Sequence, residues 1–348
     1  MQKIIFLNRI YENIKTLYPY LENKKFFAVV KSNAYGHNLE KVVSFLEKIA
    51  KQDKVLDKKL LGYAVKDFDE AKQILRLTKR KILILIEPLK NFLKDIKITK
   101  NVYPTIYDLE NLKLALKYKI PFHIKIDTGM TRLGFYPREF LKIKNFLERN
   151  IDLLDGILSH LPCADTNFEF TKKQHKLFLK LTLPLKKKKK DLILHLENSY
   201  GTLYKLKHLD AARIGLFLYF FKRQAMEVYS YLLQTKEAQF FQKVSYCGTY
   251  KVKNTEYLGI VFGGYNEGIF RKASNKAYFL IRGKKAYIRG NVCMNLIIVS
   301  LPNNKIKSGE KVEILSERHN LFYWSKIFET IPYEILTSLR GKEIFIEN

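Results

Sequence analysis

Short apolar runs alternate with amphipathic stretches over the first two-thirds of the chain. The runs are rich in Val, Ile, Leu and Phe and contain few polar residues, a pattern that is typical of strands buried on both faces of a parallel sheet. We predict eight such strands, at Phe26–Lys31, Leu60–Val65, Lys81–Ile86, Val102–Tyr107, Pro121–Asp127, Asp155–Leu161, Leu192–Asn198 and Ala211–Leu218.

The stretches between these runs place apolar residues at helical spacing. Asp67 and Asp108 stand where helix N-caps are expected, and Pro137 stands at a predicted first turn. We predict helices at Leu39–Lys51, Asp67–Leu77, Asp108–Tyr118, Pro137–Arg149 and Glu169–Leu181. The alternation fits an open, doubly wound sheet as well, but eight strand–helix units favour an α/β fold of the (β/α)8 TIM-barrel type.

The pattern changes after Phe221. Glycines become frequent, helical spacing fades, and short strand-like runs follow at Ala277–Ile281, Lys285–Ile288 and Leu296–Leu301. We therefore predict two domains, a TIM barrel over residues 1–225 and a mostly β C-terminal domain over residues 226–348.

Charge adds a question about partners, because 63 Lys and Arg against 34 Asp and Glu give a formal net charge of +29. However, 50 of the basic residues are lysines, whereas arginine is the residue that forks onto guanine edges and phosphates. We interpret the one dense run, Lys186–Lys190, as a solvated loop between elements. No zinc-finger spacing or RNA-binding aromatic run accompanies it. We therefore predict weak adhesion to polyanions and no specific nucleic-acid partner.

The cysteine content and the length of the apolar runs indicate the cellular compartment. The three cysteines, an odd and sparse set, argue against a disulfide scaffold and suit a reducing environment. No apolar run approaches the ~20 residues that a membrane helix needs. The apolar stretch within Met1–Ile10 is too short for a signal peptide. We expect a cytoplasmic protein with no membrane partner and no metal site.

In a TIM barrel the active site forms at the C-terminal ends of the strands. Lys31 closes the first predicted strand, and a half-buried lysine has a lowered pKa that suits Schiff-base chemistry. With 50 lysines in the chain, composition alone would favour a side chain that simply turns to solvent. Polar residues also follow four other strands, at Lys125–Gly134, Ser159-His160, Glu197–Ser199 and Arg213–Leu216. Their convergence on one rim favours a site that binds an anion.

Five segments in order resemble those of the pyridoxal-phosphate-dependent alanine racemases of bacterial type. They are Ala28–His37, Lys125–Gly134, Val244–Tyr250, Gly264–Gly268 and Val292–Met294. The resemblance covers nearly the whole chain, and its architecture of a barrel followed by a β domain matches the pattern above. It implies the interconversion of L-alanine and D-alanine through a pyridoxal 5'-phosphate (PLP) aldimine on Lys31, supplying D-alanine for peptidoglycan.

The resemblance also implies catalytic roles. Lys31 takes the Cα proton of the D-enantiomer on one face, and Tyr246 acts on the other face. The family's hydrogen-bonded series from tyrosine to histidine to arginine corresponds here to Tyr246, His160 and Arg213. Arg213 would face the pyridine nitrogen and, as a permanent cation, keep that nitrogen unprotonated.

Binding roles follow from the same resemblance. The cofactor-binding residues would be Lys31, Tyr35, His160, Asn198, Ser199, Arg213, Gly215 and Leu216. Arg132 and Met294 would bind the substrate, and Lys125 matches a position that is carbamylated in some members. Because the family takes its tyrosine and this methionine from the partner subunit, we expect a homodimer with composite active sites and alanine as substrate.

Three positions depart from the family pattern. Asn295 stands where the family usually has Asp, Asn291 where an arginine is common, and Gly341 where some members have a tyrosine beside the phosphate. We therefore expect an active enzyme, in which these positions alter at most the catalytic efficiency or the range of substrates. The alternatives that stay open are an amino-acid racemase of broader specificity, for example on serine, a decarboxylase on the same barrel, and a basic binding protein without activity.

Overall fold

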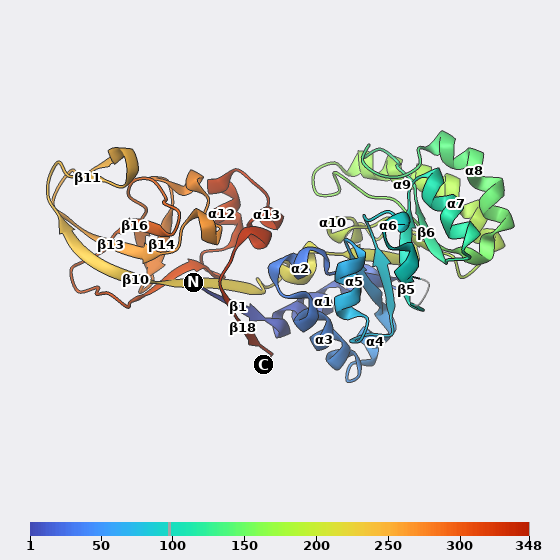
Figure 1. The fold of residues 1–348 in the computed structure, drawn as a ribbon, viewed down its shortest axis with the longest axis horizontal. Helices are drawn as coiled ribbons and strands as arrows, with labels where there is room; N and C mark the ends of the chain where they lie inside the picture. The colour runs from blue at the N-terminus through green and yellow to red at the C-terminus, as the bar shows by residue number, and fades with distance from the viewer. Residues whose placement is uncertain (97–98, 348) are drawn as a thin grey trace. The chain divides into compact units, whose positions relative to one another are not determined.

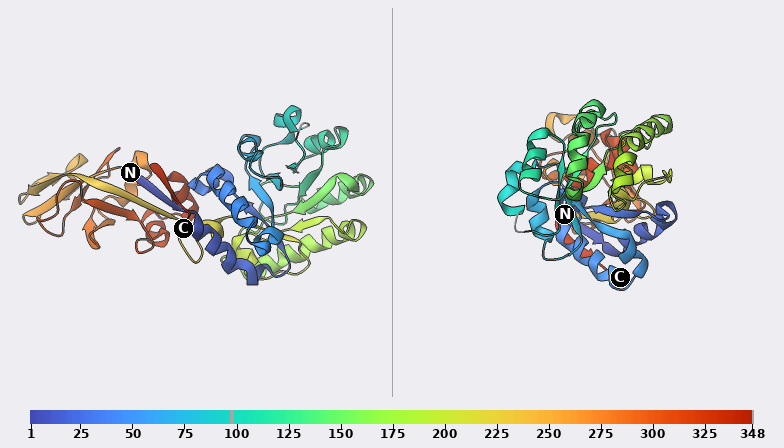
Figure 2. Two further views of the ribbon diagram at one scale, coloured as in Figure 1. Left: turned by 90° about the horizontal axis from the view of Figure 1, so that it is seen from below. Right: turned by 90° about the vertical axis from the view of Figure 1, so that its right-hand side faces the viewer.

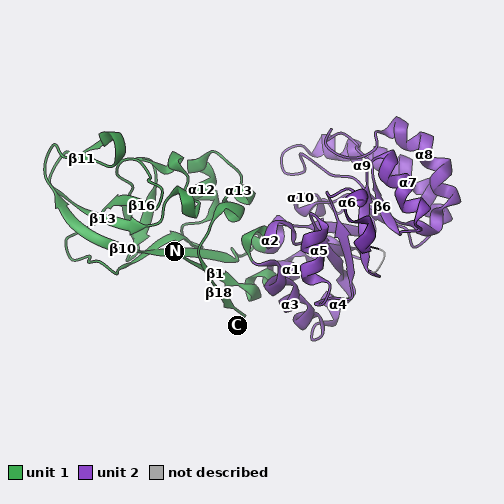
Figure 3. Cartoon of the chain, viewed as in Figure 1, with its two compact units in different colours: residues 1–12, 35–37, 219–348 green, residues 13–34, 38–218 purple. Residues whose placement is uncertain are grey.

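The computed structural model describes residues 1–96 and 99–347. Two compact units divide the chain, as Figure 3 shows. Unit 1 comprises Met1–Glu12, Tyr35–His37 and Tyr219–Asn348, and unit 2 comprises Asn13–Ala34 and Asn38–Leu218. The boundary predicted at residue 225 assigns the first twelve residues to the barrel domain, whereas here they group with the C-terminal part of the chain.

Within its described residues, unit 2 contains a closed barrel of eight parallel strands. The first and last strands pair with each other, with Ala28 opposite Ile214, and this pairing closes the barrel. The strands are β2(Lys25–Val29), β3(Leu60–Val65), β4(Lys81–Ile84), β5(Val102–Ile106), β6(Phe122–Lys125), β7(Leu154–Leu158), β8(Ile193–His195) and β9(Ala211–Ile214). The predicted TIM barrel is confirmed, and each strand lies within a few residues of its predicted place.

Burial explains why these runs form the barrel. Every residue of β6 and of β9 is buried, as expected for strands covered on one side by helices and on the other by the barrel interior. The helices lie around the outside of the strands in both views of Figure 2. They are α3(Leu39–Ala50), α4(Lys54–Lys59), α5(Phe68–Ile74), α6(Leu89–Ile96), α7(Leu109–Lys117), α8(Pro137–Arg149) and α9(Phe168–Lys188).

Local capping chemistry sets where several helices begin. The side chain of Asp67 accepts a hydrogen bond from the backbone N–H of Glu70 at 2.9 Å, and Asp108 accepts one from Asn111 at 2.8 Å. Pro137 is the first residue of α8. These two N-caps and the proline start are confirmed.

Most of the dense lysine run does not form the predicted loop. Lys186 to Lys188 occupy the last turn of α9, where cations stabilise the helix dipole. Lys186 contacts Asp210 at 2.7 Å, Lys188 contacts Glu148 at 2.7 Å, and Lys189 donates to backbone carbonyls that include that of Leu154 at 3.1 Å. The interpretation as a loop was wrong for Lys186–Lys188, because these partners, distant in sequence, let the helix continue to Lys188, whereas Lys189 and Lys190 follow its end.

Unit 1 is mostly β, as predicted. Its strand β1(Gln2–Phe6) pairs antiparallel with the long β10(Met226–Ala238) and parallel with β18(Lys342–Ile346), which joins the N-terminal segment to the C-terminal sheet. The further strands are β11(Lys243–Val244), β12(Tyr250–Lys251), β13(Glu256–Phe262), β14(Tyr278–Ile281), β15(Lys284–Tyr287), β16(Leu296–Ser300) and β17(Lys311–Leu315). Figure 1 labels β11, β13, β14 and β16. Two helices, α12(Leu321–Phe328) and α13(Pro332–Ser338), were not predicted.

Candidate active site

Lys31 lies just after β2 and opens the short helix α2(Lys31–Gly36). Its pKa is lowered from the ordinary value of 10.5 because burial penalises the ammonium group and Arg132 repels it, while Glu70 opposes the shift. A lysine with a lowered pKa offers more neutral amine at physiological pH and is suited to attack a carbonyl carbon. The structure therefore gives Lys31 the environment that a Schiff-base lysine needs.

The backbone after Lys31 is left-handed over residues 32–35, with φ between 52° and 54°. This conformation costs roughly 1–2 kcal/mol for each L-residue, so its surroundings must hold it in place. The buried carboxylate of Glu70 accepts hydrogen bonds from the backbone N–H of Asn33 and from that of Lys66, both at 3.0 Å. Sequence reasoning missed Glu70; its only signal is an acidic residue early in a predicted helix.

Lys125 is the last residue of β6 and is buried. Burial, followed by repulsion from Arg132 and Arg213, lowers its pKa to about 8, and Asp127 only partly offsets these effects. Lys31 adds to the same repulsion. This group of cations attracts an anion because the carboxylates of Asp127 and Glu70 offset the mutual repulsion only in part.

The loop after β6 is organised by Asp127. Its carboxylate accepts backbone N–H groups from Gly129 at 2.9 Å, Met130 at 2.8 Å and Arg132 at 2.8 Å. Burial tends to raise the pKa of Asp127, but these hydrogen bonds outweigh that effect and the pKa is lowered. The ionised carboxylate thus fixes the backbone that carries Arg132.

Arg213 comes from β9 and is almost fully buried. Its Nη1 donates to the carbonyl of His195 at 2.7 Å, and its Nη2 lies 3.5 Å from Nδ1 of His160. Burial and repulsion by Arg132 lower the pKa of Arg213 to about 10. Burial, followed by repulsion from Arg213, lowers the pKa of His160 well below 6.5. This imidazole is therefore neutral near pH 7. The structure brings Arg213 and His160 together, as two members of the predicted series.

A further cluster of predicted residues follows β8 and β9. The side chain of Asn198 caps α10(Ser199–Thr202) by accepting the backbone N–H of Gly201 at 2.8 Å. The buried Ser199 hydroxyl accepts the backbone N–H of Gly215 at 3.1 Å. Leu216 follows Gly215 and begins α11(Leu216–Tyr219). A hydroxyl and backbone N–H groups therefore gather here, which is the donor set of a phosphate site.

The remaining predicted residues belong to unit 1. Tyr246 is 67% exposed and Met294 is 55% exposed. The carbonyl of Tyr246 accepts a hydrogen bond from the Asn291 side chain at 2.9 Å, and the carbonyl of Met294 accepts the N–H of Asn266 at 3.1 Å. Tyr35 is buried, and its ring packs against the ring of Tyr219 at 5.0 Å. Tyr246 and Met294, in contrast, present their side chains to solvent in the isolated chain.

The positions that depart from the family pattern have local partners. The Asn295 amide donates to the carboxylate of Glu267 at 2.9 Å, a contact in which an aspartate would instead repel Glu267. Asn291 holds the Tyr246 backbone, as described above. Gly341 has φ 159°, and a side chain there would meet the carbonyl of Met1 at 3.0 Å, so glycine suits the close approach of β1.

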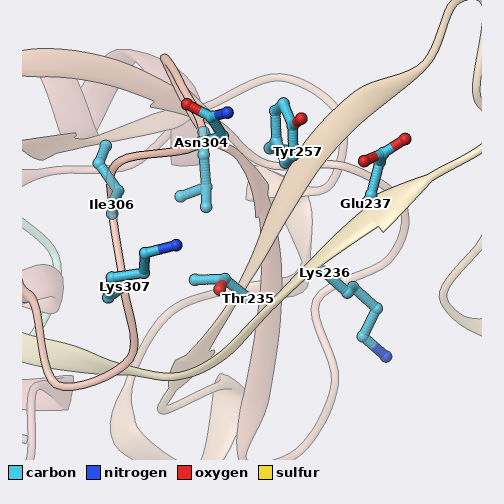
Figure 4. A pocket seen from close by; sticks show the side chains of 8 residues that line it. Thr235, Lys236, Glu237, Tyr257, Asn304, Ile306 and Lys307 are labelled. Carbon is cyan, nitrogen blue, oxygen red and sulfur yellow. The ribbon is translucent and has the colours of Figure 1, made fainter.

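Unit 1 also has a pocket of about 310 Å³ beside β10 and β13 (Figure 4). Thr235, Glu237, Tyr257, Asn304 and Lys307 are among its lining residues. No predicted site residue contributes to it, so it is separate from the candidate active site. Across residues 1–96 and 99–347, no group of His, Cys, Asp and Glu side chains is arranged to hold a metal ion. The same residues include no helix long and apolar enough to cross a membrane.

Comparison with known protein families decides the assignment. Residues 5–223 match the model of the alanine racemase N-terminal domain, and residues 225–344 match that of the alanine racemase C-terminal domain. The chain belongs to the alanine racemase family. An alanine racemase of Borreliella burgdorferi is 34% identical over 360 residues, which cover 97% of this chain and 94% of that protein.

Solved structures of alanine racemases have the same fold. An alanine racemase from Bartonella henselae with covalently bound pyridoxal phosphate has a TM-score of 0.85 and 25% identity, covering 99% of each chain. An alanine racemase from Bacillus anthracis with bound L-Ala-P has a TM-score of 0.85 and 26% identity, covering 99% of this chain and 95% of that one. The resemblance found in the sequence is therefore confirmed at the level of the family and the fold.

Proposed function

We propose that this chain is a PLP-dependent racemase that interconverts L-alanine and D-alanine. The observation that carries the proposal is the half-buried, electropositive environment of Lys31 just after β2, which lowers the pKa of its amine. Membership of the alanine racemase family and similarity to a racemase with covalently bound pyridoxal phosphate support it. The names of the similar proteins favour alanine over a broader range of amino acids.

The residues present fit PLP. Lys31 supplies the amine for its aldehyde, and Lys125, Arg132 and Arg213 form a cationic group that suits its anionic oxygens. Ser199, with the backbone N–H groups of Gly215 and Leu216, offers donors to the phosphate, and Tyr35 adds a hydroxyl. Asn198 supports this cluster by capping α10.

When bound, PLP withdraws electrons from the substrate Cα–H bond and so makes the proton acidic. Nζ of Lys31 would take the proton of D-alanine, and the hydroxyl of Tyr246 would take that of L-alanine. Lys31 would donate a proton to Cα when D-alanine is formed, and Tyr246 would do so when L-alanine is formed. Neutral His160 and the guanidinium of Arg213 would follow Tyr246 in the hydrogen-bonded series and so assist its proton transfer.

The substrate carboxylate would be bound by Arg132 and by the backbone N–H of Met294. Because Tyr246 and Met294 are exposed in the isolated chain, they are free to reach the site of a second copy. We infer a homodimer with composite active sites. We also infer a cytoplasmic enzyme that supplies D-alanine for peptidoglycan.

We expect Lys125 to become carbamylated. Carbamate forms when a neutral amine attacks CO2, and the pKa of about 8 makes much more neutral amine available here than at an ordinary lysine. The carbamate would replace a repelling cation beside Arg132 with an anion that pairs with it. At a fixed concentration of dissolved ¹³CO2, the carbamate NMR signal should therefore increase as the pH rises through about 8.

Lys125→Arg serves as the control, because it keeps the charge but cannot be carbamylated. The signal should be missing from this variant. An equally strong signal in both proteins would contradict the assignment to Lys125.

The proposed function is tested by incubating the PLP-loaded protein with L-alanine and measuring the enantiomers. L-Serine, offered in parallel, tests the broader racemase, and release of CO2 tests a decarboxylase. We expect rapid formation of D-alanine, slower turnover of serine and no CO2.

A further inference from the structure

A chain of buried side chains crosses the barrel interior below the candidate active site. Nη1 of Arg213 lies 3.1 Å from Nδ1 of His195, and Nε2 of His195 lies 2.8 Å from Nδ1 of His123. Nε2 of His123 lies 2.9 Å from a carboxylate oxygen of Asp155, whose other oxygen accepts from Lys81 at 2.7 Å. Both imidazoles are fully buried, and the proposed function gives neither of them a role.

Hydrogen-bond chemistry fixes the direction of this chain. A guanidinium only donates, so Nδ1 of His195 must accept and its proton must lie on Nε2. That N–H then donates to Nδ1 of His123, whose own proton lies on Nε2 and donates to the Asp155 carboxylate. A single assignment of protons satisfies all three contacts.

Protonation of either imidazole would break the chain. A proton on Nδ1 of His195 would face the N–H of Arg213, and one on Nδ1 of His123 would face the N–H of His195. Burial accordingly lowers the pKa of both histidines. Burial alone would raise the pKa of Asp155, but hydrogen bonds and charge from His123 and Lys81 outweigh it and bring the pKa to about 2. The carboxylate therefore remains an acceptor.

The backbone is shaped around this arrangement. A Cβ at Gly156 would lie 2.4 Å from Nδ1 of His123, so only glycine leaves room for the ring. The ring also makes edge contacts with Tyr103 and Phe27, with ring centroids 5.9 Å and 6.0 Å away. The imidazole of His123 is held between these groups and has little freedom to turn.

We propose that His195, His123 and Asp155 are positioning residues for the reaction, which fix the guanidinium of Arg213 through two neutral imidazoles of one tautomer. The other partners of Arg213 are the backbone carbonyls of His195, Ser159 and Leu196 and Nδ1 of His160. The chain adds a fixed acceptor and links the guanidinium to the opposite charge of Asp155. The catalytic consequence rests on the proposed function, but the proton assignment does not.

The proton assignment is tested by NMR of the PLP-loaded protein labelled with ¹⁵N-histidine, with the two signals assigned by substitution. We expect His123 and His195 to remain neutral with the proton on Nε2 from about pH 6 to about pH 9, whereas an exposed histidine titrates near 6.5. A protonated ring, or the proton on Nδ1 of either, would overturn the proposal. This result does not depend on whether the protein racemises alanine.

The positioning role is tested by comparing His123→Gln with His123→Phe. The Gln amide offers an acceptor to His195 and a donor to Asp155, whereas Phe matches the ring but offers neither. We expect Phe to lower kcat about 10–100-fold with KM little changed, as for supporting groups elsewhere, and Gln to retain most of kcat.

If His123 served only for packing, the His123→Phe variant would have the same kcat as His123→Gln. That result would overturn the positioning role. If the Phe variant does not fold, the tautomers of the wild-type and Gln proteins decide the question. If the wild-type protein does not racemise alanine while its tautomers are as expected, the proposed function fails and the hydrogen-bond chain stands.

Discussion

The Lys31→Ala variant should lose both the absorbance of covalently bound PLP and all measurable racemisation of alanine. The substitution removes the amine that links the cofactor and the group that moves the proton on one face of the substrate. Proton transfer alone is worth 10²–10⁴-fold, so we expect a fall in kcat/KM of at least ~10⁴-fold. The measurements are the absorption spectrum after PLP loading and the initial rates from both enantiomers.

Lys72→Ala is the matched control, because it removes the same charge from an exposed helix position. Its spectrum and rates should equal those of the wild-type protein. Retention of the bound-PLP spectrum in Lys31→Ala, with unchanged thermal unfolding, would show that another amine carries the cofactor.

The Tyr246→Phe variant should separate the two faces of the reaction. Loss of the hydroxyl removes the base for L-alanine and the acid for its re-formation, so racemisation should fall by ~10²–10⁴-fold in both directions. Lys31 remains able to remove the proton of D-alanine. In D2O, NMR should therefore show continued exchange of the Cα proton of D-alanine and almost none for L-alanine.

Tyr231→Phe is the control, since Tyr231 is 45% exposed and its ring stacks on Phe262 with or without the hydroxyl. It should exchange both enantiomers normally. Equal exchange from both enantiomers by Tyr246→Phe would exclude the two-base assignment.

Mixing the two inactive variants tests the composite site. If Tyr246 acts on the partner subunit, a hybrid dimer of Lys31→Ala and Tyr246→Phe contains one intact site. Random exchange of subunits would then restore roughly a quarter of wild-type activity. No recovery after proven subunit exchange would place both residues in one chain's own site.

Much of the barrel could be predicted because its strands are continuous apolar runs with clear helix starts such as Asp67 and Asp108. The features that were not predicted fall where partners distant in the sequence decide the structure. Lys186–Lys188 remain helical because Asp210 and Glu148 compensate their charge. The strand β1 joins the C-terminal sheet by pairing with β10 and β18, partners that no local pattern reveals.

The residues of the candidate site likewise include some that the sequence could predict and others that it could not. Lys31, Arg132 and Arg213 stand at strand ends within motifs, so sequence alone could propose them. Glu70 could not be found, because its importance arises from the left-handed backbone that it holds. His123 and His195 are polar residues within mostly apolar strands, and only the barrel's closure shows that they meet.

The most direct test of the central claim is the enantiomer composition of alanine after incubation with the PLP-loaded protein. Enantiomers have equal free energies in an achiral solvent, so a racemase must bring pure L-alanine and pure D-alanine to the same equal mixture. We predict this convergence from both starting points, measured by chiral chromatography. Alanine that retains its original configuration, while the spectrum shows bound PLP, would contradict the assignment of this chain as an alanine racemase.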